Sequence, residues 1–296
     1  MATMSLAAGL ARLFADALQD ERTVVLGDHV ARLGGFGGVF AGLADTHQGR
    51  VLDLPISDRA TLGAALGMAL AGQRVVVELA DSGRVWASLE VLAEAAAIAR
   101  KGEFPVRLAV RVPAGGQAGP VLDRPAAEAL AAIDGLTVVC PATAADTLGA
   151  WNAALSARGP VVVLEPRTLL TRRADGPSNV RFGSARAVRS GRDVLLVSWG
   201  SGVSRAVEAA DALHDEAIEA GVLDLLTLSP LDADALGAEL RACGRMVLVE
   251  APEGGLTDRV LHTALQEAFL HLEAPLATAP ASVQAITAAA TRTVLY

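Results

Sequence analysis

Short apolar runs alternate with stretches of helical periodicity along most of the chain. The runs are rich in Val and Leu and lie at 23–27, 74–79, 106–112, 136–140 and 160–165. Between them, apolar residues recur at helical spacing at 5–19, 59–71, 85–100 and 144–157. Strands that are apolar on both faces are typical of parallel sheets covered by helices on both sides. The pattern therefore predicts an α/β fold with doubly wound sheets.

The alternation is interrupted once, between residues 171 and 191, where Gly, Pro, Ser, Asn and Arg accumulate. It then resumes with strands at 193–200, 221–232 and 245–250 and with helices at 203–219, 233–242 and 256–271. We expect two domains, at 1–172 and 191–296, joined by a linker at 173–190 with one short strand. No repeat unit recurs along the chain, which excludes a solenoid.

The composition excludes several classes of protein. Hydrophobic residues make up 52% of the chain, so it can bury a sizeable core. The net charge of −8 argues against nucleic acid and anionic membranes as partners. The uncharged run 60–73 is shorter than the roughly 18 residues of a membrane span, and we see no secretory signal, so we expect a cytoplasmic protein. With two cysteines, a disulfide framework and a zinc finger are excluded.

Acidic residues stand where three predicted strands end. Asp28 and Asp81 follow the strands at 23–27 and 74–79, and Asp58 precedes a helix. Ligands of open parallel sheets bind at this edge, but each residue also fits an ordinary turn or helix cap, and Ser57 or Asp58 is a typical N-cap. The segment 200–202 is either an anion site at a helix start or a tight turn, which we favour. The five histidines have no metal-ligand spacing.

Several segments in order carry a resemblance to a known family. They include VVLGDHV at 24–30, LPISDRATLGAALGMALAGQRVVVEL at 54–79, RVPAGG at 111–116, GPVVVLEPRTLL at 159–170 and GRMVLVEAPEGG at 244–255. The chain resembles the beta subunit of thiamine-diphosphate-dependent 2-oxoacid dehydrogenases over roughly residues 20–295. The resemblance implies a pyrimidine-binding domain followed by a transketolase C-terminal-type domain. It also implies an alpha subunit that holds the cofactor's diphosphate and the magnesium ion, so no metal is expected on this chain.

The resemblance assigns one catalytic residue. In the family, a Glu in a PISE-type motif hydrogen-bonds the aminopyrimidine ring of the cofactor and favours the tautomer that activates it. The matching residue is Asp58, in the sequence PISD, whose side chain is one methylene shorter. Further cofactor-binding residues implied by the alignment are Asp28, Ile56, Arg84 and Trp86.

Other family positions have changed around this site. The Phe that packs on the pyrimidine aligns with Arg84, which can stack on a ring as a cation. The H-S-Q motif aligns with 122–124, so its His is missing, and Asp123, which we take as a substrate-pocket residue, is no obvious replacement for it. A carboxylate of a monovalent-cation loop aligns with Ala157, and the His of the V-V-V-H-E-A segment is missing at 249–251.

Three hypotheses follow from the resemblance. The first is an active beta-type subunit in a heterotetramer with an alpha subunit, using thiamine diphosphate on a 2-oxo acid or ketose donor, with a lipoyl or acyl carrier protein as a further partner. The second is a non-catalytic paralogue that stabilises or regulates an active partner. The third is a binding module that uses its second domain as an interaction surface. Retention of a carboxylate at Asp58 favours the first, and loss of the family's His and Phe favours the second.

Overall fold

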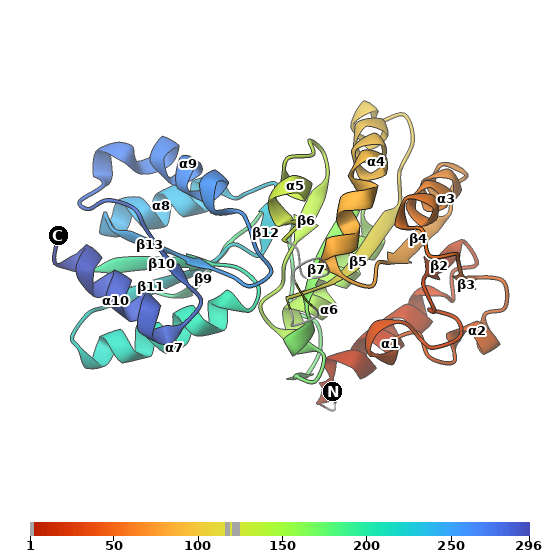
Figure 1. Cartoon of the computed structure of the whole chain (residues 1–296), viewed down its shortest axis with the longest axis horizontal. Coiled ribbons are helices and arrows are strands. Elements are labelled where there is room, and N and C mark those ends of the chain that lie inside the picture. Colours follow the sequence, from red (N-terminus) through yellow and green to blue (C-terminus); the bar gives the residue numbers. More distant parts are fainter. Residues whose placement is uncertain (1–2, 116–118, 120–124) are drawn as a thin grey trace.

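The first half of the chain folds around a seven-stranded sheet. The computed structural model describes residues 3–115, 119 and 125–296, which form two α/β lobes side by side (Figure 1). The sheet has the order β12-β6-β7-β5-β4-β2-β3, and its strands are parallel except for β12, which is antiparallel to β6. The strands are β2 (Thr23–Gly27), β3 (Val51–Asp53), β4 (Arg74–Glu78), β5 (Leu108–Ala114), β6 (Thr137–Val139), β7 (Val161–Pro166) and β12 (Thr227–Ser229).

Helices cover both faces of this sheet. One face packs on α1 (Leu6–Ala17) and α6 (Ala144–Ser156), and the other on α3 (Asp58–Leu70), α4 (Leu89–Lys101) and α5 (Ala127–Ala131). The short α2 (Leu43–Thr46) precedes β3. Along β2, Val24 and Leu26 face one core and Val25 the other, which is why the strand is apolar at every position.

The second lobe has the same two-sided construction. Its sheet has the order β14-β13-β10-β11-β9, with β9 as the one antiparallel strand. Helices α7 and α10 lie on one face, and α8 and α9 on the other (Figure 1). The elements are β9 (Arg186–Arg189), β10 (Val194–Ser198), α7 (Gly202–Asp215), β11 (Ala220–Asp224), α8 (Ala233–Cys243), β13 (Met246–Glu250), α9 (Thr257–Ala268), β14 (Ala277–Pro280) and α10 (Val283–Val294). The predicted α/β fold class with two doubly wound domains is confirmed.

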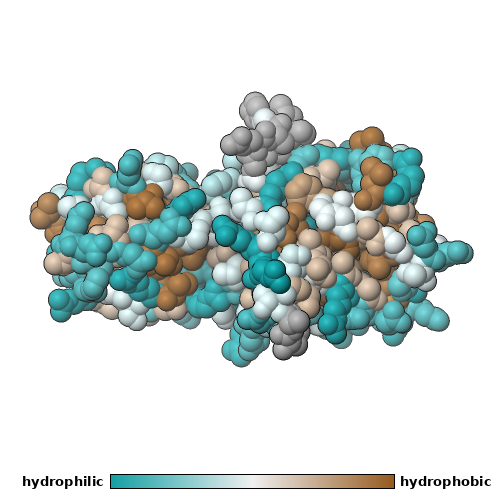
Figure 2. Space-filling model, turned by 90° about the horizontal axis from the view of Figure 1, so that it is seen from below, coloured by the Kyte–Doolittle hydropathy of each residue, from teal (hydrophilic) through white to brown (hydrophobic). Residues whose placement is uncertain are grey.

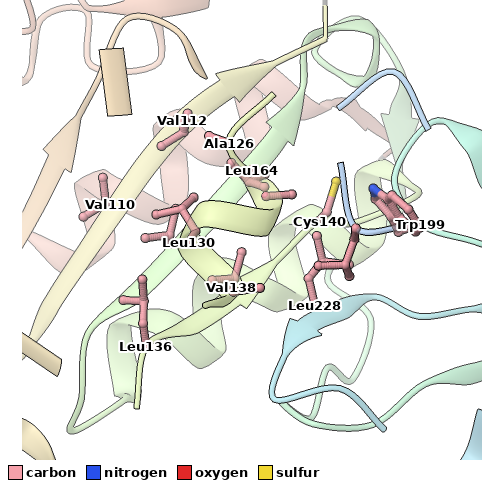
Figure 3. Close-up of a cluster of buried hydrophobic side chains, with 14 of the residues drawn as sticks. Val110, Val112, Ala126, Leu130, Leu136, Val138, Cys140, Leu164, Trp199 and Leu228 are labelled. Atoms are coloured by element: carbon pink, nitrogen blue, oxygen red, sulfur yellow. The ribbon is translucent and has the colours of Figure 1, made fainter. Parts of the chain in front are cut away.

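One chain segment contributes a strand to each sheet and so joins the two lobes. The run 221–232, predicted as one strand, forms β11 in the second sheet and β12 in the first. Trp199 and Leu228 from the second half pack with Cys140 at the end of β6 (Figure 3), and all three are fully buried. Apolar packing between the lobes is therefore continuous, although from below the surface shows two lobes with a narrower waist (Figure 2).

Several element boundaries differ from the predicted ones. The segment 173–190, predicted with one short strand, contains two. The first is β8 (Arg173–Ala174), which pairs with β1 (Met4–Ser5), and the second is β9, near the end of the segment. The helix predicted at 203–219 ends at Asp215, because residues 220–224 form β11. The helix predicted at 85–100 begins at Leu89, after a 3-10 helix at Ser82–Ser88. Helical periodicity does not separate these two helix types over one or two turns.

An ion cluster also connects the lobes. Arg186 donates to both oxygens of Asp146 on α6, at 2.8 Å each, and to Asp224 at the end of β11, at 3.1 Å. The residues Asp146 and Asp224 are almost completely buried. Burial raises the pKa of Asp224 to about 7. For Asp146, burial is outweighed by hydrogen bonds from Arg186, Thr143 and Ser178, which lower its pKa.

Candidate functional site

Two carboxylates and one guanidinium lie together at the carboxyl edge of the first sheet. Arg84 Nε donates to Asp58 Oδ2 at 2.7 Å, and Arg84 Nη1 donates to Asp28 Oδ2 at 3.2 Å. The three side chains are mostly buried, with exposed fractions of 13% for Asp58, 17% for Arg84 and 18% for Asp28. The sequence predicted all three as site residues, and the structure brings them into direct contact through three different strand ends.

Asp58 is placed by the start of α3, but it is not the cap. The Ser57 side chain accepts from the backbone N–H of Ala60, so Ser57 is the N-cap and Asp58 is the first helical residue. Of the two caps that the sequence allowed, the structure selects Ser57. Within the described part of the chain, no group donates to Asp58 Oδ1, so this oxygen remains an available acceptor.

The remaining predicted residues lie on the same chain segments as this cluster, after β3 and β4. Ile56 is 72% exposed, directly before the cap, and Trp86 is half-buried in the 3-10 helix after β4. Asp81 is buried, and its side chain accepts from the backbone N–H of Arg84, which fixes the start of that 3-10 helix. Burial raises the pKa of Asp81. The predicted substrate-pocket residue Asp123 lies outside the described residues.

A second ion cluster lies behind the site, inside the sheet. Arg111 on β5 is fully buried between Glu78 on β4 and Glu165 on β7, to which its Nη2 donates at 2.5 Å. Glu78 also accepts from the backbone N–H of Phe36 at 2.6 Å, and Arg111 donates to the Phe36 carbonyl at 2.8 Å. Burial raises the pKa of Glu78. This cluster holds the glycine-rich loop 34–38 against the strand ends.

Arg167 is a site-edge residue that the sequence reasoning missed. It follows β7 directly, and its guanidinium carbon lies 4.5 Å from the centre of the Phe36 ring. Its Nη2 donates to the Ala80 carbonyl at 3.1 Å, while its buried Nε has no hydrogen-bond partner. Its position directly after a parallel strand is the signal that could have found it.

The segment 200–202 binds a carboxylate from elsewhere in the same chain. Ser201 donates to Glu253 Oε2 through its backbone N–H at 3.3 Å and through its hydroxyl at 3.1 Å. Burial raises the pKa of this Glu253 carboxyl. The start of α7 therefore binds the protein's own carboxylate. The segment also forms the turn that we favoured from the sequence, in which the N–H of Gly202 donates to the Trp199 carbonyl at 3.1 Å.

Two other kinds of feature are absent from the described residues. No group of three or more His, Cys, Asp or Glu side chains is arranged to hold a metal ion. No helix in the same part of the chain combines the length and apolarity needed to cross a bilayer. Both cysteines, Cys140 and Cys243, are buried free thiols.

Comparison with known families accounts for most of the chain. The model of the transketolase pyrimidine binding domain matches residues 2–173, and that of the transketolase C-terminal domain matches residues 183–293. Among solved structures, a split-gene transketolase, described as an inactive beta4 tetramer, has a TM-score of 0.72 at 21% identity, with 99% of each chain covered. Transketolase from Leishmania mexicana has a TM-score of 0.74 at 18% identity and covers all of this chain and 46% of its own.

Curated relatives show more specifically which proteins of this family the chain resembles. The beta subunit of acetoin:2,6-dichlorophenolindophenol oxidoreductase from Cupriavidus necator is 36% identical, over 81% of this chain and 74% of its own. The pyruvate dehydrogenase E1 beta subunit of Acholeplasma laidlawii is 33% identical, over 86% and 82%. The 3-methyl-2-oxobutanoate dehydrogenase beta subunit of Mycobacterium tuberculosis is 33% identical, over 87% and 77%. The chain thus belongs to the transketolase-like family, with the beta subunits of 2-oxoacid dehydrogenase E1 components as its relatives.

Proposed function

We propose that this chain is the beta-type subunit of a thiamine-diphosphate enzyme that acts on a 2-oxo acid or ketose-like donor. The observation that carries the proposal is the placement of Asp58. Its carboxylate lies at the carboxyl edge of a parallel sheet, with one oxygen held by Arg84 and the other available. A carboxyl group fixed in this way can share a proton with the ring nitrogen at the aminopyrimidine end of the cofactor.

The residues around Asp58 fit that end of the cofactor. When bound, thiamine diphosphate supplies a carbon nucleophile that attacks the 2-oxo group. Asp58 hydrogen-bonds the pyrimidine ring nitrogen and shares a proton with it. Asp28 fixes Arg84, whose guanidinium offers a flat surface in the place of an aromatic ring, and Ile56 and Trp86 line the same edge.

The proposal includes a partner that completes the site. An alpha-type subunit supplies the diphosphate and magnesium ligands, in a cytoplasmic heterotetramer that passes its product to a lipoyl or acyl carrier protein. We also propose the domain limits 1–172 and 191–296, with 173–190 between them. Coexpression with alpha-type subunits from the same genome, followed by cofactor analysis of the purified complex, tests the proposal. A complex that forms but retains no thiamine diphosphate would refute it.

The isolated chain is expected not to bind thiamine diphosphate tightly. It offers only the pyrimidine end, and no metal-binding group is present among the described residues to hold the diphosphate through magnesium. Calorimetry with magnesium present should show no submicromolar binding, and the coexpressed complex serves as the positive control. A tight one-to-one isotherm for the chain alone would contradict the shared-site model.

The exposed side of α3 is expected to be a subunit contact. It carries the small residues Ala60, Gly63, Ala64 and Gly67, and a Cβ added at either glycine would meet nothing within 4 Å. Light scattering should therefore give at least a dimer. Gly67→Glu should shift the population toward monomer without loss of folding, because Glu favours a helix over Gly. Ala288→Glu, at an exposed position of α10, is the control. A monomeric wild-type chain at micromolar concentration would contradict this expectation.

A second candidate function has one observation in its favour. The position of the family's stacking aromatic is held by Arg84, and its ion pairs with Asp58 and Asp28 already satisfy the cluster without a ligand. Such a site suits a non-catalytic paralogue that stabilises an active partner. Cofactor proton exchange in the complex separates the two functions, since only the catalytic role requires Asp58.

A further inference from the structure

Three arginines lie together at the amino edge of the first sheet, the edge opposite the candidate site. Arg22 directly precedes β2, Arg74 is the first residue of β4, and Arg107 directly precedes β5. These strands are neighbours, because β2 pairs with β4 and β4 pairs with β5. The three arginines line a small cavity of about 70 Å³, together with Asp20 and Gly72. Parallel pairing thus brings cations from three separate segments to one place.

The cavity has more positive than negative charge. Among the described residues that line it, only Asp20 is acidic. Arg74 Nη1 donates to Asp20 Oδ2 at 3.2 Å, and Arg22 Nε lies 3.5 Å from Asp20 Oδ1. The half-buried Arg107 side chain forms no hydrogen bond or ion pair with any described residue. Three guanidinium groups therefore share one carboxylate, in a chain whose net charge is −8.

Arg74 is held in place but is only partly satisfied. Its Nη1 also donates to Thr23 Oγ1 at 3.1 Å, and its side chain is 26% exposed. Its Nε is buried and has no hydrogen-bond partner in the described part of the chain. Like charges that lie close together repel, and a partly buried cation loses hydration, so this cluster costs free energy. An anion in the cavity would neutralise the excess charge and supply the missing acceptors.

A larger groove shares Arg74 with this cavity. The groove has a volume of about 480 Å³ and lies between α1 and α6, with Leu13, Leu148 and Leu155 among its apolar residues. The two helices approach closely because Gly9 has no Cβ; an added one would lie 3.0 Å from a Leu148 methyl group. The volume of the groove is typical of small-molecule pockets, whereas the cationic cavity suits a single small group. The two together therefore suit a ligand with an anionic group and a partly apolar body.

We propose that this edge binds a phosphate monoester, with its phosphate group between Arg22, Arg74 and Arg107 and its body in the groove between α1 and α6. A phosphate monoester carries a charge of about −1.5 to −2 at pH 7 and three acceptor oxygens, which match the excess charge and the three guanidinium groups. A carboxylate carries one charge and two oxygens, so it matches less well. The proposal concerns the edge opposite Asp58 and does not depend on the proposed function.

Calorimetry on the full chain in a phosphate-free buffer tests this proposal. Phenyl phosphate is the probe, and inorganic phosphate and benzoate are the comparison ligands. Phenyl phosphate should bind saturably and at least about 10-fold more tightly than inorganic phosphate, because its ring enters the apolar groove. It should also bind more tightly than benzoate, which has the same ring but a single negative charge.

Two variants separate the cationic cavity from the groove. Arg107→Met should weaken binding of both phosphate ligands about 10- to 100-fold, as expected for loss of a charged hydrogen bond. Leu155→Gln should weaken binding of phenyl phosphate and leave that of inorganic phosphate unchanged. Arg259→Met is the matched control, because it removes an exposed arginine on α9, in the other lobe, with the same change in net charge. It should leave the binding of all three ligands unchanged.

Arg22→Met should give the same loss as Arg107→Met, and it replaces that variant if Arg107→Met does not fold. Three results would each overturn the proposal: no saturable binding of phenyl phosphate, an equal affinity for benzoate or for inorganic phosphate, or an equal loss in Arg259→Met. Because the measurement needs neither cofactor nor partner subunit, none of these results bears on the thiamine-diphosphate proposal.

Discussion

Replacing Asp58 with Asn should slow the exchange of the proton on the reactive carbon of the cofactor by about 100-fold or more in the complex with an alpha subunit. The amide N–H of Asn can donate a hydrogen bond to the pyrimidine ring nitrogen, but Asn cannot hold or share a proton. It can also keep the contact with Arg84, because its amide oxygen still accepts from the guanidinium Nε. Hydrogen–deuterium exchange at that carbon, followed by NMR after rapid acid quench, measures the rate directly.

Two further variants separate catalysis from helix stability. Ser57→Ala removes the N-cap of α3 and should cost about 0.5–2 kcal/mol of stability with little change in the exchange rate. Asp58→Glu restores the longer reach found in the family and should keep or raise the rate. Equal exchange in wild type and Asp58→Asn would reject the catalytic role and favour the non-catalytic paralogue.

The strands were the most predictable part of the fold. The strands β2, β4 and β7 lie within one residue of their predicted limits, because burial on both faces makes every position apolar. By contrast, β12 could not be separated from β11. Its three residues pair with β6, far away in the sequence, and local patterning does not encode such a pairing. The elements β14 and α10 lie in a segment that alternates small and polar residues without a clear period.

The candidate site was predictable as a set of residues but not as a set of contacts. Asp28 and Asp58 could be found because both stand beside strand ends. Arg84 could be found only by alignment, and its commitment to both carboxylates depends on how three separate loops converge. Arg167 was missed because its distinguishing property is a missing partner, which a sequence does not display.

Replacing Asp224 with Asn should stabilise the protein more at pH 8 than at pH 5. Burial raises the pKa of Asp224 to about 7 from an ordinary value of 3.8, and the nearby charges of Asp146 and Arg186 oppose each other. The folded state therefore binds a proton that the unfolded state has lost between about pH 4 and pH 7. Stability from this group is fully present below that window and declines as the pH rises through it.

The variant lacks this titration, so its stability relative to wild type should rise by about 2–3 kcal/mol from pH 5 to pH 8. Denaturant unfolding at pH 5, 6.5 and 8 measures the difference. The variant keeps the hydrogen bond from the Leu226 backbone N–H, because the Asn oxygen still accepts it. Asp211→Asn is the control, because Asp211 also pairs with an arginine of β9 but is 71% exposed. A constant difference for Asp224→Asn across this range would mean that Asp224 is ionised throughout, with Arg186 compensating the charge of Asp224 as well as that of Asp146.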